Sequence, residues 1–172
     1  MYHMKIYITG GSGSGKTTIS KRMAKRHGVP YLDLDTVKWV NDGGKKFVKS
    51  RSIDERKKII DHFIAQNQDW ICDGVYYHDW INTILEKADI VIVLQTSRWR
   101  RHFRCIKRAF CEESLRTMSI RALWDLLCWD HKYDTAYWPM LKTKLDKLGV
   151  AYKIICADNI EKLSKPIDFT KI

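Results

Sequence analysis

The residues with the clearest chemistry are glycines, serines, a lysine and a threonine near the N-terminus. The run from Gly10 to Thr17 reads GGSGSGKT, which meets the pattern G-x-x-x-x-G-K-[ST]. In this pattern backbone N–H groups surround a phosphate, the lysine reaches the β- and γ-phosphates, and the hydroxyl ligates Mg²⁺. An apolar strand before the run and an amphipathic helix after it are the context that a phosphate-binding loop requires. The N-terminus of this helix would also attract the phosphate. The sequence therefore predicts a nucleoside-triphosphate site. The residues expected at the nucleotide are Gly10, Gly11, Ser12, Gly13, Ser14, Gly15, Lys16, Thr17 and Thr18.

Three aspartates stand where predicted strands end. Asp73 follows three apolar residues and precedes a glycine, and Asp33 and Asp35 alternate with leucines. Carboxyl ends of parallel strands meet at one edge of a sheet, so these side chains are expected near the phosphates. We expect Thr17, Asp33 and Asp73 around Mg²⁺, and Asp35 to orient or deprotonate an acceptor hydroxyl. The residues alone leave two alternatives open: Asp73 as a turn or cap residue, and the other two as a helix cap and an exposed loop residue.

The segment from Arg98 to Arg108 carries six basic residues and no acidic one. On a helix Arg101, Arg104 and Arg108 share one face, at spacings of three and four. Such a face can clamp phosphates during their transfer or stack on an adenine ring. A solvated basic face is the alternative.

Short apolar stretches alternate with helical ones, which predicts an α/β domain built on a parallel sheet. Strands are expected at Lys5–Thr9, Pro30–Leu34, Trp70–Asp73, Ile90–Leu94 and Ala151–Cys156. Helices are expected at Lys16–His27, Ile53–Gln66, His78–Glu86, Trp99–Arg108 and about Ile120–Leu148, where Pro139 should kink or break the helix. A single domain over residues 1–172 is expected, with an acceptor-side flap at about 36–52 and a short lid at about 109–119.

The charge of the chain favours negatively charged partners but does not identify one of them. A net charge of +11 and a pI near 9.5 favour a polyanion, which nucleotides, nucleic acids and acidic membrane surfaces all provide. No apolar run approaches the roughly 20 residues needed to cross a bilayer, so we expect no membrane span. The five cysteines are scattered and lack zinc-site spacing, which favours free thiols and a cytoplasmic location. The surplus aromatic residues of the last helix suit a core, a homodimer interface or a surface that stacks on a base or another planar molecule. We therefore expect the protein to be a monomer or a homodimer.

Four segments carry a resemblance to a known family. ITGGSGSGKTTISKRMA, LDLDTVKW, WICDGVY and ADIVIVLQTSRWRRHFRCIKR follow one another as in small nucleotide kinases. Over about residues 4–148 the chain resembles adenylate-kinase-like proteins of the P-loop kinase superfamily, and especially the DNA topology modulation group. This resemblance implies a three-layer fold with a five-stranded parallel sheet of order 2-3-1-4-5, ATP with Mg²⁺, and phosphoryl transfer.

The resemblance also implies roles for single residues. Arg104 resembles the arginine that packs on the ATP base, and Arg108 the one that contacts its phosphates. Asp73 resembles the third-strand aspartate, while Asp33 and Asp35 resemble the paired acids of shikimate- and gluconate-kinase-like relatives. The AMP-binding pattern after the first helix has no clear counterpart, which disfavours AMP as the acceptor.

We therefore expect an ATP-dependent phosphotransferase that acts on a nucleoside, a nucleotide or a small hydroxylated metabolite. Its catalytic residues would be Lys16, Asp35, Arg104 and Arg108. The alternative is an ATP-binding protein that interacts with nucleic acid and has little kinase activity.

Overall fold

The computed structural model describes residues 4–42, 45–111 and 120–156, and its centre is a five-stranded parallel sheet. The strands lie in the order β2-β5-β1-β6-β7, which is 2-3-1-4-5 when the sheet strands alone are numbered, so the predicted fold class is confirmed. Their bounds are Lys5–Thr9 (β1), Tyr31–Asp33 (β2), Trp70–Gly74 (β5), Ile90–Gln95 (β6) and Tyr152–Cys156 (β7).

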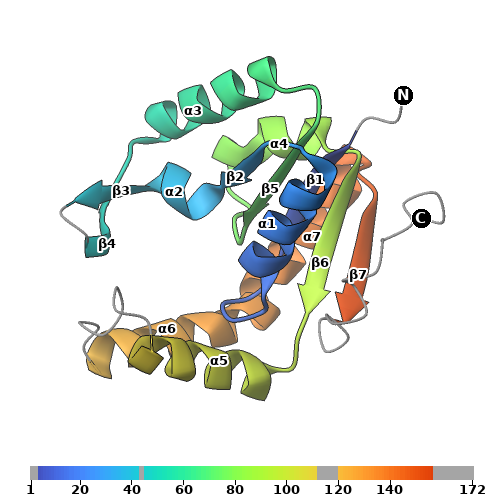
Figure 1. Cartoon of the computed structure of the whole chain (residues 1–172). Helices are drawn as coiled ribbons and strands as arrows, with labels where there is room; N and C mark the ends of the chain where they lie inside the picture. The colour runs from blue at the N-terminus through green and yellow to red at the C-terminus, as the bar shows by residue number, and fades with distance from the viewer. Residues whose placement is uncertain (1–3, 43–44, 112–119, 157–172) are drawn as a thin grey trace.

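Helices cover both faces of this sheet, as Figure 1 shows. They are α1 (Lys16–His27), α2 (Leu34–Lys38), α3 (Ile53–Gln66), η1 (Asp79–Ile81), α4 (Asn82–Lys87), α5 (Arg98–Cys111), α6 (Ile120–Lys132), the π-helical η2 (Tyr133–Tyr137) and α7 (Trp138–Leu148). Alternate strand residues point to opposite faces, so β1 contributes to two apolar cores. Ile6 and Ile8 pack with residues of α1, whereas Tyr7 packs with residues of α3, α4 and α7.

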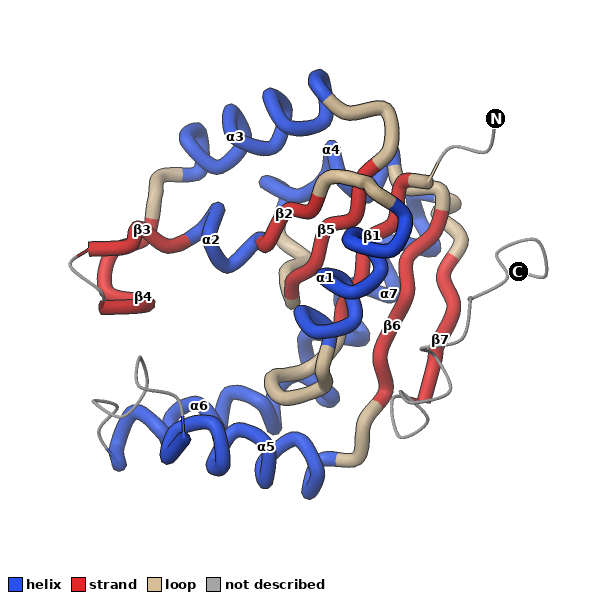
Figure 2. The backbone as a smooth tube through the Cα atoms, viewed as in Figure 1, coloured by secondary structure: helices blue, strands red, loops and turns tan. Residues whose placement is uncertain are grey.

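The region predicted as an acceptor-side flap contains regular structure. Helix α2 is followed by a two-stranded antiparallel hairpin of β3 (Trp39–Asp42) and β4 (Lys45–Ser50), which stands to one side of the sheet beyond β2 in Figure 2. Arg51 ties the two parts together: its Nη1 donates to the carbonyl oxygens of Thr36, Val37 and Trp39 at 2.6, 3.1 and 2.9 Å. Of the predicted lid, residues 109–111 belong to α5, and 112–119 lie outside the described residues.

The predicted long helix at 120–148 is helical wherever it is described, but it is not uniform. Residues Tyr133–Tyr137 form a π-helical turn between α6 and α7, and Pro139 lies at the start of α7. A proline cannot donate a backbone hydrogen bond and its ring crowds the preceding turn, which a wider π turn relieves. Within the described residues, no helix combines the length and the apolar composition needed to cross a membrane.

Candidate nucleotide-binding site

The GGSGSGKT run connects β1, the middle strand of the sheet, to the first turn of α1. Gly13 and Gly15 have φ angles of +74° and +92°, a left-handed backbone that favours glycine. Gly15 is the residue before α1, so the helix begins at Lys16 with its N-terminus toward the loop. The strand–loop–helix context expected of a phosphate loop is therefore present.

Two glycines of this loop also allow α5 and α6 to approach it closely. A Cβ atom on Gly11 would lie 2.7 Å from Oδ1 of Asp130 and 2.9 Å from Nε of Arg101. A Cβ atom on Gly13 would lie 2.5 Å from the carbonyl oxygen of Arg101. All three separations are too short for a real Cβ atom, so glycine is needed at both positions for packing within the protein.

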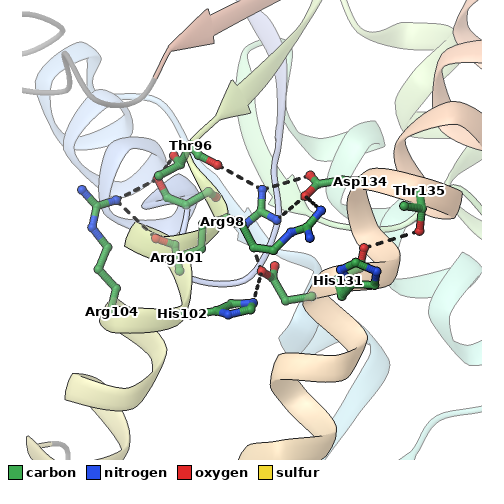
Figure 3. A network of polar contacts seen from close by, with 11 residues as sticks. Thr96, Arg98, Arg101, His102, Arg104, His131, Asp134 and Thr135 are labelled. Carbon is green, nitrogen blue, oxygen red and sulfur yellow. Dashed lines mark hydrogen bonds and ion pairs between the residues drawn. The ribbon is translucent and has the colours of Figure 1, made fainter.

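Arg101 belongs to a buried ionic network behind the loop (Figure 3). Its side chain is 2% exposed, and its Nε donates to Oδ2 of Asp130 at 3.0 Å. Its two terminal nitrogens donate to the carboxylate of Asp134 at 3.0 and 2.7 Å, and one also donates to the carbonyl oxygen of Thr96 at 3.1 Å. The interpretation of a shared phosphate-facing surface with Arg104 and Arg108 is wrong for Arg101, because acids from α6 and η2 compensate its charge.

Arg104 points the other way on α5, toward the phosphate loop. Its Nη1 donates to the carbonyl oxygens of Gly13 at 3.3 Å and Ser14 at 3.4 Å. Figure 3 shows the Arg104 side chain extending away from Asp134. Arg108 lies one turn further along the helix and is exposed. The structure thus brings Arg104 to the loop, and Arg108 to the neighbouring surface of the same helix.

Asp73 is the second-last residue of β5, the strand next to β1, and it pairs in register with Ile8. Its side chain is fully buried, and its Oδ1 accepts a 2.7 Å hydrogen bond from the Tyr31 hydroxyl. Burial raises the pKa of Asp73 to about 6 and Asp33 contributes, although Lys16, the Tyr31 hydroxyl and the Thr17 hydroxyl lower it. Its Oδ2 is buried with no standard hydrogen-bond partner among the described residues. The carboxyl thus interacts with the loop's lysine and threonine, and one of its oxygens is left without a hydrogen bond of standard geometry among the described residues.

The other two aspartates have separate roles in the fold. Asp33 caps α2, because its Oδ1 accepts from the backbone N–H of Asp35 at 2.9 Å; this is the helix-cap alternative. Burial and the Asp35 carboxylate raise the pKa of Asp33, while the capping hydrogen bond and Lys16 lower it, so Asp33 also lies near the loop's lysine. Asp35 is not an exposed loop residue, since its Oδ1 accepts a 2.6 Å hydrogen bond from the Tyr76 hydroxyl.

Sequence reasoning missed the two tyrosines whose hydroxyls donate to Asp73 and Asp35. Tyr31 and Asp33 alternate on β2 and share a face, so strand periodicity could have placed this hydroxyl near the strand's acidic end. Tyr76 is 41 residues from Asp35, and no local pattern links the two. The described residues hold no group of three or more His, Cys, Asp or Glu side chains that could bind a metal ion by themselves.

Comparison with known proteins defines the class of fold. The structure is similar to shikimate kinase from Bacteroides thetaiotaomicron, with a TM-score of 0.57, 18% identity, and coverage of 90% of this chain and 87% of that one. It is equally similar to shikimate kinase from Acinetobacter baumannii in complex with shikimate, with a TM-score of 0.57, 16% identity, and coverage of 97% and 96%. The chain therefore shares the fold of these two shikimate kinases.

The sequence comparisons cover less of the chain than the structural ones do. No protein-family model matches the chain. The uncharacterized protein YqaC of Bacillus subtilis strain 168 is 33% identical over 89 residues, which are 52% of this chain. That match spans 47% of the length of YqaC, or about half of the relative.

Proposed function

We propose that this protein is an ATP-dependent phosphotransferase that moves the γ-phosphoryl group of ATP to a small acceptor. The observation that carries the proposal is the set of charges around the phosphate loop. Lys16 acts on the carboxylates of Asp33 and Asp73 on one side, and Arg104 reaches the loop carbonyls from the other. The shikimate-kinase-like fold supports a small-molecule kinase.

In this proposal most of the catalysis comes from positioning and electrostatics. Lys16 and Arg104 would neutralise charge that develops on the transferred group, and Arg108 would contact the phosphates from the next helical turn. Asp35, fixed by the Tyr76 hydroxyl, would accept a hydrogen bond or a proton from the acceptor hydroxyl. The proposal includes a flap at about 36–52 over the acceptor and a lid at about 109–119 over the nucleotide.

The residues beside the loop fit a magnesium ion. Asp73 offers a buried oxygen without a hydrogen-bond partner, and the Thr17 hydroxyl is close enough to lower the pKa of this carboxyl. Thr17, Asp73 and Asp33 would hold the ion directly or through water. When bound, Mg²⁺ supplies positive charge that orients and neutralises the phosphate oxygens.

The test is acceptor-dependent ADP release across a panel of nucleosides, nucleoside monophosphates and small hydroxylated metabolites. We expect Lys16→Ala to abolish turnover, because the substituted side chain carries the charge at the β- and γ-phosphates. Lys25→Ala, at an exposed position in the last turn of the same helix, is the matched control and should retain full turnover. Circular dichroism checks that both variants fold. Unchanged turnover in Lys16→Ala would contradict the proposal.

An ATP-binding, nucleic-acid-interacting protein is the second candidate. Three aromatic side chains on α5, Trp99, Phe103 and Phe110, are 85, 66 and 73% exposed among its arginines and lysine, a composition suited to stacking on bases and pairing with phosphates. This function predicts binding to single-stranded DNA that weakens steeply with salt, as counterions are released. If binding is absent at low salt, this candidate is removed.

A further inference from the structure

Helix α5 carries a line of large apolar side chains on its solvent-exposed side. Four of them follow one another at spacings of four, three and four residues: Trp99, Phe103, Ile106 and Phe110. Such spacings keep side chains on one face of a helix, and all four are exposed. We call this line the apolar stripe. At 1.5 Å per residue it is about 16 Å long.

The opposite face of α5 is the one that packs on the protein. Arg101 and Cys105 are buried there, and Arg104 reaches the phosphate loop. At 3.6 residues per turn, Phe103 and Phe110 lie about 160° and 180° around the helix from Arg101. Figure 1 shows α5 along the border of the molecule. A surface helix normally turns its apolar side chains toward the core, so a stripe that faces outward indicates a surface for another molecule.

Basic side chains accompany the stripe. Arg100 and Lys107 are seven residues apart, lie on one side of it and are exposed. No acidic residue occurs in α5, and the whole chain carries a net charge of +11. The long stems of arginine and lysine can lie along an apolar surface while their charged ends stay in water. The partner that complements this face therefore has an apolar interior and a negatively charged surface.

A second copy of this chain lacks that complementary charge. A symmetric contact through α5 would place the same patch on both sides, so the basic side chains of one helix would meet those of the other. Neither helix has an acid to compensate them. Such a contact between like charges is unfavourable.

A single-stranded nucleic acid, the second candidate above, would supply the charge but fits the shape less well. Proteins that bind single strands combine a basic groove for the backbone with aromatic rings on which bases stack. The apolar stripe lies instead on the convex outer face of one helix, and Ile106 has no ring for a base. A lipid bilayer accepts aliphatic and aromatic side chains alike, and it needs no groove.

We propose that α5 docks on the surface of an anionic lipid bilayer, with the helix axis parallel to the membrane plane. The apolar stripe would enter the boundary between headgroups and acyl chains, where tryptophan and phenylalanine are favoured. Arg100 and Lys107 would lie among the phosphate and carboxylate groups of the lipids. The proposal does not rest on the proposed function, because no residue of the stripe has a role at the nucleotide or the acceptor.

The test measures cosedimentation of the full chain with lipid vesicles. Vesicles of phosphatidylcholine and phosphatidylserine in equal parts are the anionic probe, and vesicles of phosphatidylcholine alone are the neutral comparison. We expect the unmodified protein to bind the anionic vesicles about tenfold more tightly or better. This binding should weaken as the salt concentration rises, because ions screen the attraction.

Variants separate insertion of the stripe from attraction by charge. Phe103→Ser and Phe110→Ser should each weaken binding to the anionic vesicles about tenfold, since each removes a ring from the bilayer boundary. Met140→Gln, which removes an exposed apolar side chain from α7, is the matched control and should bind as the unmodified protein does. Lys107→Gln should weaken binding about fivefold. Its control, Lys58→Gln, removes an exposed charge from α3 and should change binding by less than about twofold.

Circular dichroism checks that the variants fold. Equal affinity for the two kinds of vesicle, or affinities within about twofold of the unmodified protein in both serine variants, would overturn the proposal. Binding to single-stranded DNA that Phe103→Ser abolishes, in a protein that does not bind vesicles, would assign the stripe to nucleic acid instead. A homodimer that Phe103→Ser dissociates in sedimentation equilibrium, again without vesicle binding, would assign it to a second copy.

Discussion

Replacing Asp73 with asparagine tests whether burial beside the loop disfavours the charged form of this carboxyl in the free protein, despite the nearby Lys16. Burial raises the pKa of this carboxyl from 3.8 to about 6, although Lys16 and Tyr31 oppose the rise. A group whose pKa is higher in the folded than in the unfolded protein stabilises the fold in its protonated form. The stabilisation is complete below the unfolded pKa and is lost as the pH rises through about 6.

The size of the effect follows from the two pKa values. A rise of about two units corresponds to roughly 3 kcal/mol of unfolding free energy, and roughly 2 kcal/mol of this is lost between pH 4.5 and 7.5. Asparagine at position 73 does not titrate. Its amide leaves a buried N–H group with an imperfect partner, but this offset is independent of pH and leaves the slope unchanged. From about pH 4.5 to 7.5, the stability of Asp73→Asn relative to the unmodified protein should therefore rise by roughly 2 kcal/mol.

Urea unfolding followed by circular dichroism, in a chelator and without nucleotide, measures this difference at each pH. Asp61→Asn removes an exposed carboxylate from α3 and is the control, for which we expect a constant difference from the unmodified protein. Mg²⁺ with ATP should stabilise the unmodified protein more than Asp73→Asn, since only the carboxylate gains a cation. A separation between the Asp73→Asn and unmodified curves that stays constant across pH would refute the reasoning.

Two further predictions concern the packing of α5 against the loop. Arg101→Met leaves Asp130 buried without its cation and should lower the unfolding free energy by roughly 3–5 kcal/mol, measured by urea unfolding; a loss below about 1 kcal/mol would show that the network is dispensable. Gly13→Ala and Gly28→Ala both place alanine at a positive φ, +74° and +65°, but only the first puts a Cβ atom 2.5 Å from the Arg101 carbonyl oxygen. We expect about 1–2 kcal/mol of destabilisation for Gly28→Ala and clearly more for Gly13→Ala, so equal losses in thermal or urea unfolding would contradict the packing.

Local signals were sufficient for much of the fold. The strand Lys5–Thr9 and the helix Ile53–Gln66 have the predicted bounds. The helix begins where Ser52 and Glu55 form a reciprocal capping box, a signal contained within four residues. The order of the sheet needed more than local signals, and it came from the resemblance to nucleotide kinases.

Long-range packing explains what sequence reasoning missed. Helical spacing predicts a shared face for three arginines of α5, but Arg101 and Arg104 point different ways in the structure. The spacing cannot say which arginine α6 will bury, since Asp130 lies 29 residues from Arg101. Likewise, the pattern that ends β2 suits a metal ligand and a helix cap equally well. Asp33 became the cap because a helix begins at Leu34, whose side chain is fully buried in the core that α2 shares with α3.

The close approach of α5 and α6 to Gly11 and Gly13 has a consequence for how this chain could diverge. Even if nothing bound at the loop, both positions would be held to glycine, because a Cβ atom there would collide with Arg101 or Asp130. Glycines retained without the lysine would be a record of inherited architecture and no longer of chemistry.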